Sequence, residues 1–447
     1  MNFQSGSDIP HSRRQFLKGS TTFAVGGALA PYILVKPKLH AANSETLKVG
    51  LIGCGGRGTG AASQALNADK NVMLTAMGDI FDDRLQGSLK SLKGEEAIRS
   101  KIAVNPETTF IGLDAYKKVL ASGVDVVLLA TPPGFRPFHL KAAIEAGKHV
   151  FCEKPMATDA PGLRSVMASV QMAREKKLSL VAGFCWRYNA GERELMKRVH
   201  GGEIGEPMAV ETVYNTGSLW VHPRKPEWTD MQYQMRNWYY FTWLSGDHIV
   251  EQAVHSLDKM AWAMKDVPPL KCVAHGGRQA RTGKDYGHIF DHFSVVYEYP
   301  NGARGYHSCR QQSGCAQANA DHINGTKGIA RINAFGPLTI TGANPWRFSG
   351  ERPNMYQVEH DELFASIRNG QPLNDGDRMS RSTMIAIMGR MAAYTGQEIT
   401  WEQALNSEEN LTKQAVGQEG KEGDPEFRWD LKLYEAPVAI PGLTKFA

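Results

Sequence analysis

The sequence predicts an α/β Rossmann dinucleotide-binding domain followed by an α+β domain with a largely antiparallel, open-faced sheet. Two patterns support this prediction. Between residues 47 and 152, continuous apolar runs alternate with amphipathic helical patterns, which is typical of a parallel sheet covered by helices on both faces. After Arg187 the strand patterns become alternating or aromatic, as in antiparallel sheets. We expect the two domains at residues 45–185 and 186–400, with a C-terminal extension over 401–447.

The elements of the first domain follow from these patterns in chain order. Strands are expected at 47–52, 72–78, 124–130, 148–152 and 178–183. Helices are expected at 58–67, 82–92, 114–122, 136–146 and 159–175.

In the second domain, strands are expected at 207–215, 270–276, 290–299, 303–309, 326–333 and 337–341. Helices are expected at 247–265, 357–369 and 378–395. Residues 215–244 show little regular pattern and an unusual density of Trp and Tyr. Because a long loop inside a compact domain is usually functional or an interface, this stretch is a candidate for either role.

A glycine-rich turn follows the first strand. Residues 53–58 read GCGGRG and fit the pattern G-x-G-x-x-G. In that pattern Gly53 permits the tight turn, Gly55 lets the backbone approach a pyrophosphate, and Gly58 lets the next helix pack on the strand. Gly56 and Arg57 lie in the turn just before the helix expected at 58–67, whose N-terminal N–H groups favour phosphate. A glycine turn without a ligand is the alternative.

An acidic residue at the end of the second strand supports the dinucleotide interpretation. Asp79 lies about twenty residues after the last glycine, where a carboxylate binds the ribose hydroxyls. A carboxylate disfavours a 2′-phosphate, so we predict NAD rather than NADP. Arg57 and Arg84 leave room for NADP.

The N-terminus predicts export. Residues 12–18 read SRRQFLK before a mildly apolar stretch, and they resemble a twin-arginine signal, which we place at residues 1–42. We therefore expect the twin-arginine machinery as a partner and a periplasmic or otherwise exported location. Without residues 1–41 the chain is nearly neutral, which gives no support to nucleic acid or an anionic membrane as a partner. Because this route exports folded proteins, the six cysteines are interpreted as free thiols.

Further polar residues follow two strands of the predicted parallel sheet. Thr131 and Pro132 come after 124–130, with His139 in the next helix, and Glu153 and Lys154 come after 148–152. Ligands of such sheets bind at the carboxyl ends of the strands. A lysine beside a nicotinamide can serve in acid–base chemistry, although a surface lysine in a turn is the alternative.

These motifs carry a family resemblance. The glycine loop, the TPP sequence with His139, HVFCEKPMA at 149–157 and GFCWRY at 183–188 resemble the Gfo/Idh/MocA family of sugar and cyclitol oxidoreductases. The resemblance implies that Lys154 is the catalytic lysine and that Thr131, Pro132, His139 and Glu153 lie at the cofactor. It also implies the same two domains and a homo-oligomer formed through the open sheet face.

Trp186, Arg187 and Tyr188 end a strand at the domain junction, where they are candidates for the substrate cleft.

The family also has a helix-borne motif, G-G-x-x-x-D-x-x-x-H, which the sequence from Ser245 to Asp258 resembles. The resemblance implies a catalytic histidine at His255 and places Glu251 at the family's aspartate. Residues 251 and 255 are four apart, so on one continuous helix they share a face. His248, two turns earlier, could then also face the cleft. A buried structural histidine at position 255 and a metal site formed by residues 248, 251 and 255 are alternatives; we predict no metal.

The aromatic stretch allows two interpretations. Rings with interleaved polar groups suit the faces and hydroxyls of sugars, and they also suit subunit packing. Trp238 is our candidate for substrate contact. Its neighbours of interest are Trp220, His222, Arg224, Trp228, Arg236, Tyr239, Tyr240 and Trp243.

Taken together, the sequence predicts an exported NAD(H)-dependent oxidoreductase that transfers hydride from a hydroxyl-bearing carbon of a sugar, sugar derivative or cyclitol. Because no supply of free NAD is expected outside the cytoplasm, the cofactor is predicted to stay tightly bound. One alternative is an NAD-dependent glycosidase that oxidises the ring transiently and eliminates the aglycone. The other is a non-catalytic carbohydrate-binding protein.

Overall fold

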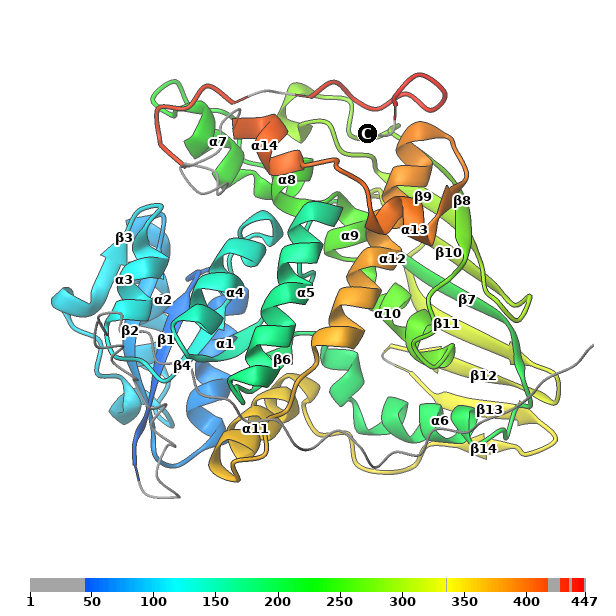
Figure 1. Ribbon diagram of the computed structural model, residues 1–447, viewed down its shortest axis with the longest axis horizontal. Helices are drawn as coiled ribbons and strands as arrows, with labels where there is room; N and C mark the ends of the chain where they lie inside the picture. The colour runs from blue at the N-terminus through cyan, green and yellow to red at the C-terminus, as the bar shows by residue number, and fades with distance from the viewer. Residues whose placement is uncertain (1–44, 335, 417–426, 434–435, 446–447) are drawn as a thin grey trace, which may run out of the picture. The chain divides into compact units, whose positions relative to one another are not determined.

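The computed structural model describes residues 45–334, 336–416, 427–433 and 436–445 (Figure 1). The predicted signal at 1–42 lies outside the described residues. Among the helices that are described, none is both long enough and apolar enough to cross a membrane.

The first half of the chain forms a six-stranded parallel sheet with the strand order β3-β2-β1-β4-β5-β6 (Figure 1). Its strands are β1 Leu47–Ile52, β2 Val72–Asp79, β3 Thr109–Ile111, β4 Val126–Leu129, β5 His149–Cys152 and β6 Leu180–Ala182. The helices between them are α1 Gly56–Ala68, α2 Asp82–Gly94, α3 Ala115–Ala121, α4 Arg136–Glu145 and α5 Ala160–Glu175. This order confirms the predicted Rossmann fold. The strand order reverses between β1 and β4, and ligands of such sheets bind at the carboxyl ends beside this reversal.

The second half forms a nine-stranded sheet in the order β14-β13-β12-β11-β7-β10-β9-β8-β15. Its strands are β7 Pro207–Thr216, β8 Lys271–Gly277, β9 His292–Glu298, β10 Arg304–Gln311, β11 Ala318–Gly325, β12 Gly328–Asn333, β13 Leu338–Gly342, β14 Trp346–Arg347 and β15 Ile399–Thr400. Every neighbouring pair is antiparallel except β7 and β10, which are parallel. The predicted largely antiparallel sheet is confirmed.

The helices of this half are α6 Ala190–His200, α7 Asp230–Arg236, α8 Thr242–Ser245, α9 His248–Glu251, α10 Val254–Ala263, α11 Met355–Arg368, α12 Gly376–Thr395, α13 Trp401–Leu405 and α14 Leu411–Val416. The single helix predicted at 247–265 is wrong, because the chain breaks between α9 and α10. At the break, the backbone N–H of Ala253 donates to His248 O and that of His255 donates to Gln252 O. These bonds replace the regular i→i−4 pattern.

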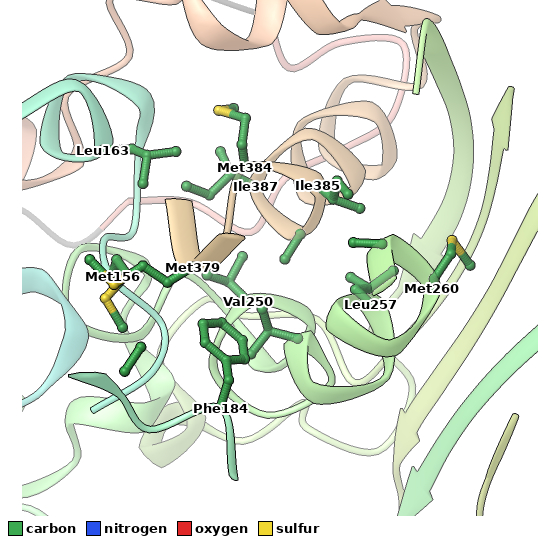
Figure 2. Close-up of a cluster of buried hydrophobic side chains, with 14 of the residues drawn as sticks. Met156, Leu163, Phe184, Val250, Leu257, Met260, Met379, Met384, Ile385 and Ile387 are labelled. Atoms are coloured by element: carbon green, nitrogen blue, oxygen red, sulfur yellow. The ribbon is translucent and has the colours of Figure 1, made fainter. Parts of the chain in front are cut away.

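Helix α12 links the two halves of the molecule. It packs on α5 from the first half and on α10 and β8 from the second. Figure 2 shows Met379, Met384, Ile385 and Ile387 of this helix meeting Leu163 of α5 and Leu257 of α10 in one buried cluster. Helix α11 similarly returns to the first sheet, where it packs on α1. Segments from the second half of the chain therefore pack against the first half, across the domain boundary expected at 185/186.

Candidate active site

A cavity of about 750 Å³ lies at the carboxyl ends of the first sheet's strands. Its walls come from the glycine loop, the ends of β2 and β4, the residues after β5, and the α9–α10 break. The predicted cofactor and catalytic residues on its walls are Gly53, Gly55, Gly56, Arg57, Gly58, Asp79, Thr131, Pro132, His139, Glu153, Lys154, Glu251 and His255. Gly53 and His255, which are 202 residues apart in the sequence, thus line one cavity.

Three glycines of the loop have the different structural roles expected of them. Gly53 has φ +95°, and a Cβ there would lie 2.7 Å from the Ala130 backbone. A Cβ on Gly58 would lie 1.9 Å from Gly53 O, so only glycine lets α1 pack this closely. A Cβ on Gly55 would meet no described atom within 4 Å.

Helix α1 begins at Gly56, and no described side chain caps it. Its first-turn N–H groups therefore remain available to an anion. With the open side of Gly55, this arrangement fits the pyrophosphate of a dinucleotide.

Asp79 ends β2 at the same edge of the sheet. Its carboxylate accepts hydrogen bonds from the backbone N–H of Cys54 at 2.6 Å and of Phe81 at 2.9 Å. Burial raises the pKa of this carboxyl group, and the two backbone N–H groups oppose the increase. Asp79 lines the cavity beside Arg84, so the end of the cavity expected to hold the ribose contains one acidic and one basic side chain.

Lys154 is held against the α9–α10 break. Its Nζ donates to the main-chain oxygen of Glu251 at 2.5 Å and to Glu251 Oε1 at 2.9 Å. The carbonyl is available because the helix is interrupted after Glu251, so the N–H of His255 donates to Gln252 O instead. An ammonium has three N–H donors, so one remains for a ligand in the cavity.

His255 shares the cavity despite the break in the helix. Its Nδ1 is buried and has no hydrogen-bond partner among the described residues. Burial lowers the pKa of this imidazole well below its usual value, and the nearby charges of Lys154, Lys259 and Arg57 lower it further. The ring is therefore neutral near pH 7, and one of its nitrogens carries a lone pair that can accept a hydrogen bond.

Glu153, next to the lysine, is fixed by Arg57. The Arg57 guanidinium pairs with Glu153 and with Glu359, the latter at 2.8 Å. A Cβ on Gly183 would lie 2.7 Å from the Glu153 carboxyl group, which explains the glycine that begins the GFCWRY sequence. The charge of Arg57 is thus already balanced by protein carboxylates, which leaves less of it for a 2′-phosphate.

The TPP motif forms another part of the wall. Thr131 Oγ1 lies 3.1 Å from His139 Nδ1, and the His139 ring stacks on Tyr116 with centroids 4.2 Å apart. Burial lowers the pKa of His139 to about 3, with a further contribution from Arg136, so this ring is neutral at physiological pH.

The aromatic stretch divides between the two roles considered for it. Trp220, His222, Arg236 and Trp238 line the cavity. Trp228, Tyr239, Tyr240 and Trp243 belong to an adjoining apolar cluster, against which Trp238 also packs. We call residues 217–240 the strap.

Arg236 ties the strap to the first domain. Its guanidinium pairs with Asp83 at 2.7 and 2.8 Å and lies 3.7 Å from the centre of the Phe81 ring. The Phe81 ring also lies 5.9 Å from that of Trp429 in the C-terminal extension. Both segments are therefore anchored beside Asp79.

Four residues predicted at the substrate do not line the cavity. Arg187 is buried in ion pairs with Asp258 at 2.9 Å and Asp266 at 2.7 Å. The Tyr188 hydroxyl donates to Asp375 at 2.7 Å. The Trp186 ring lies 5.0 Å from Lys259 Nζ, in the same buried polar region. These three residues thus join elements of the core.

His248 is the fourth. Its Nδ1 lies 3.0 Å from Asp247 Oδ1 and its Nε2 lies 3.5 Å from Cys309 Sγ, and the residue is buried. Because the helix breaks after Glu251, the two-turn spacing does not bring His248 to the face of His255. The three-residue metal alternative fails for the same reason, and the described part of the chain holds no group of three His, Cys, Asp or Glu side chains suited to a metal. All six cysteines are unpaired, and five of them are buried.

Sequence reasoning missed several residues on the cavity wall. Tyr214 comes from the end of β7, Tyr356 from α11 and Gln252 from the α9–α10 break. Gln252 lies inside the helix-borne motif from Ser245 to Asp258. Its position next to Glu251 was the one feature of the sequence that could have indicated a place on the cavity wall. The two tyrosines enter the wall only through tertiary packing.

Comparison with known proteins identifies the family. Residues 47–184 match the model described as "Oxidoreductase family, NAD-binding Rossmann fold" of the Gfo/Idh/MocA group, and residues 193–331 match the Gfo/Idh/MocA C-terminal domain. Together these matches span more than half of the chain, which belongs to the Gfo/Idh/MocA oxidoreductase family. It is therefore assigned as an enzyme, and the non-catalytic alternative is not retained.

Among curated proteins, the chain is 30% identical over 259 residues to inositol 2-dehydrogenase 3 of Saccharopolyspora erythraea, covering 58% of this chain and 65% of that one. It is 27% identical over 255 residues to 2,7-anhydro-N-acetylneuraminate hydratase of Escherichia coli, covering 56% and 61%. The alignments thus span less than two thirds of these relatives.

Among solved structures, the fold is similar to an aldose-aldose oxidoreductase from Caulobacter crescentus, with a TM-score of 0.62 and 18% identity over 80% of this chain and all of that one. An oxidoreductase from Agrobacterium radiobacter in complex with NAD+ gives a TM-score of 0.59 at 16% identity, covering 80% and 98%. A 3-ketoreductase from Actinomadura kijaniata in complex with NADP gives 0.61 at 18%, covering 78% and 98%. At these identities the likeness shows the fold alone.

Proposed function

We propose that this protein oxidises a hydroxyl-bearing carbon of a sugar, sugar derivative or cyclitol with NAD. The observation that carries the proposal is the meeting of Lys154, Glu251 and His255 at the same cavity as the open glycine loop. The inositol dehydrogenase among the relatives supports a polyol as the substrate class.

The chain's own residues handle orientation and the proton. A dinucleotide held by the glycine loop and Asp79 would supply a hydride acceptor for the substrate carbon. Lys154, held by Glu251, donates its remaining N–H to the substrate oxygen and stabilises the negative charge that develops there. The neutral His255 imidazole accepts the hydroxyl proton, so the alcohol becomes a carbonyl.

We propose NAD as the cofactor because Asp79 places a carboxylate where a 2′-phosphate would lie. Arg84 on the same wall is the residue that would support NADP. Titration of both cofactors into the nucleotide-free protein tests this preference, and tighter binding of NADP would contradict it.

We also propose that the cofactor is retained and that the protein is exported through the twin-arginine route. The SRRQFLK sequence supports export. The strap supports retention, because Arg236 fastens it beside Asp79. Nucleotide that co-purifies with the mature protein is the expected result, and a nucleotide-free preparation that exchanges added NAD rapidly would count against retention.

A homo-oligomer formed through the second sheet is part of the proposal. Tyr306, Val296 and Val273 are neighbours across three adjacent strands, so they form one row on one face. Tyr306 is 45% exposed and Val273 is 44% exposed, although both are large and apolar. Such a row supports association, and sedimentation of the purified protein measures it.

A specific observation favours one alternative function, an elimination cycle without net oxidation. The hydratase among the relatives supports a redox-neutral cycle, in which oxidation labilises a neighbouring C–H bond, elimination follows and the ring is reduced again. Lys154 and His255 would then serve both the redox and the elimination steps. Release of an aglycone without net formation of reduced nicotinamide would distinguish this cycle from simple oxidation.

The test is a panel of aldoses, cyclitols and aryl glycosides added to the NAD-loaded protein, with absorbance of the reduced nicotinamide and mass spectrometry of the products. The proposal predicts reduction by at least one sugar or cyclitol. A protein that binds NAD but responds to no member of the panel would overturn it.

A further inference from the structure

We infer that Gln252 presents its amide N–H₂ group to the cavity and donates a hydrogen bond to a substrate oxygen. Its orientation is dictated by two buried residues behind it, Gln311 and Arg281. The inference rests on the proposed function and adds a residue that selects the substrate's functional group.

The argument starts at Arg281, in the loop after β8. Its side chain is 1% exposed. A guanidinium can only donate hydrogen bonds. One terminal nitrogen donates to Phe290 O at 3.0 Å and the other donates to the side-chain oxygen of Gln311. Arg281 therefore forces the oxygen of the Gln311 amide to face it.

Gln311, at the end of β10, transmits this polarity. Its main-chain N–H donates to Asp291 O at 2.9 Å, and its side chain is 1% exposed, so the residue is held on both sides. Because its amide oxygen faces Arg281, its nitrogen points the other way. That nitrogen donates to the Tyr239 hydroxyl at 2.8 Å and to the side-chain oxygen of Gln252.

Gln252 is the last member of the chain of hydrogen bonds. Its amide oxygen is engaged by Gln311, so its nitrogen is the polar atom left to serve the cavity. The residue is half-buried, lies in the α9–α10 break and follows Glu251, which holds Lys154. A donor at this point lies beside the proposed site of chemistry.

The polarity sets a requirement on the substrate. A donated N–H is satisfied by an oxygen with a free lone pair, such as a second hydroxyl, a ring oxygen or a carbonyl. A substrate with a methylene or an ammonium at this point would leave the buried N–H unpaired, which is costly. The geometry thus points to discrimination in favour of polyols oxygenated next to the oxidised carbon, and against deoxy and amino analogues.

Two substitutions test the two parts of the inference. Gln252→Met removes the donor at similar volume, and we expect KM for the best polyol of the panel to rise about tenfold, with a smaller change in kcat. Gln311→Glu keeps an acceptor for Arg281 but cannot donate to residue 252. The Gln252 amide must then turn over to donate to Glu, and its oxygen faces the cavity.

We therefore expect Gln311→Glu to raise KM at least as much as Gln252→Met, with cofactor affinity unchanged. The double variant should be no worse than Gln311→Glu alone, because both changes remove the same donor. The control is Gln371→Met, an exposed glutamine that does not belong to the cavity lining, which should leave KM unchanged.

An unchanged KM in Gln252→Met, in a protein whose wild type turns over the polyol, overturns this inference and leaves the proposed function intact. Strictly additive effects of the two substitutions also overturn it. If the wild type turns over no member of the panel, the proposed function fails and the inference fails with it. Loss of folding in Gln311→Glu is detected by its melting temperature, and the Gln252→Met result then decides alone.

Discussion

The strap is expected to control how fast the cofactor leaves, and Arg236→Ala is the perturbation that tests it. Arg236 makes two hydrogen bonds to Asp83 and lies 3.7 Å from the Phe81 ring centre. Asp83 is 62% exposed, so the ion pair is partly screened and contributes at most about 1 kcal/mol. The cation–π contact adds about 0.5–1 kcal/mol. Loss of both should favour strap opening by about tenfold.

The assay is the release of bound NADH after mixing with excess NAD, followed by nicotinamide fluorescence. We expect release to be about tenfold faster in Arg236→Ala. The matched control is Arg224→Ala, since Arg224 pairs at 2.6 Å with Asp230 inside the same stretch of chain. Added salt should accelerate release from the wild type more than from Arg236→Ala. Equal release rates for the wild type and both variants would refute the role of the strap.

Three further predictions follow from the site. Lys154→Ala should bind cofactor normally and lower kcat by about 10²–10⁴-fold, as measured in the polyol assay, and a near-normal kcat would rule out its proposed role. The pKa of buried His255 is lowered, so its contribution to the free energy of unfolding is present above the unfolded-state value of about 6.5 and is lost as pH falls below it. In urea titrations the wild type should therefore lose stability relative to His255→Gln as pH falls below about 6.5, and a difference that does not change with pH would contradict this. Gly183→Ala should destabilise the fold by about 1–3 kcal/mol, because its Cβ would contact the Glu153 carboxyl group; an unchanged urea midpoint would contradict this.

The first sheet was predictable because its strands are continuous apolar runs separated by helical patterns. The elements that were missed lack such a signal. Strand β11 reads ANADHING, and its buried Asp321 is paired with the buried Lys259, a partner distant in the sequence. Strand β3 has three residues, too few for a periodic pattern. Helix α6 carries charges of both signs. Its buried face includes Glu192, so the sequence shows no continuous apolar face there.

The site could be predicted where one short motif contains all the residues that a role requires. The glycine loop and Lys154 are of this kind, because their roles depend on local backbone and on strand ends. The relation between Glu251 and His255 was derived from a continuous helix, yet the residues meet at the cavity through a broken one. His248 was misplaced for that reason. The polarity of Gln252 depends on Gln311 and Arg281, which only the folded sheet brings together.

The central claim is that Lys154 donates a hydrogen bond to the oxygen of a sugar or cyclitol that is oxidised beside a bound nicotinamide. The most direct measurement is a single turnover, in which the NAD-loaded wild type and Lys154→Ala are mixed with the same polyol and reduced nicotinamide is recorded. We predict formation of reduced nicotinamide in the wild type and almost none in Lys154→Ala, although both retain the cofactor. Equal reduction in the two proteins, or none in the wild type with any polyol, would contradict the claim.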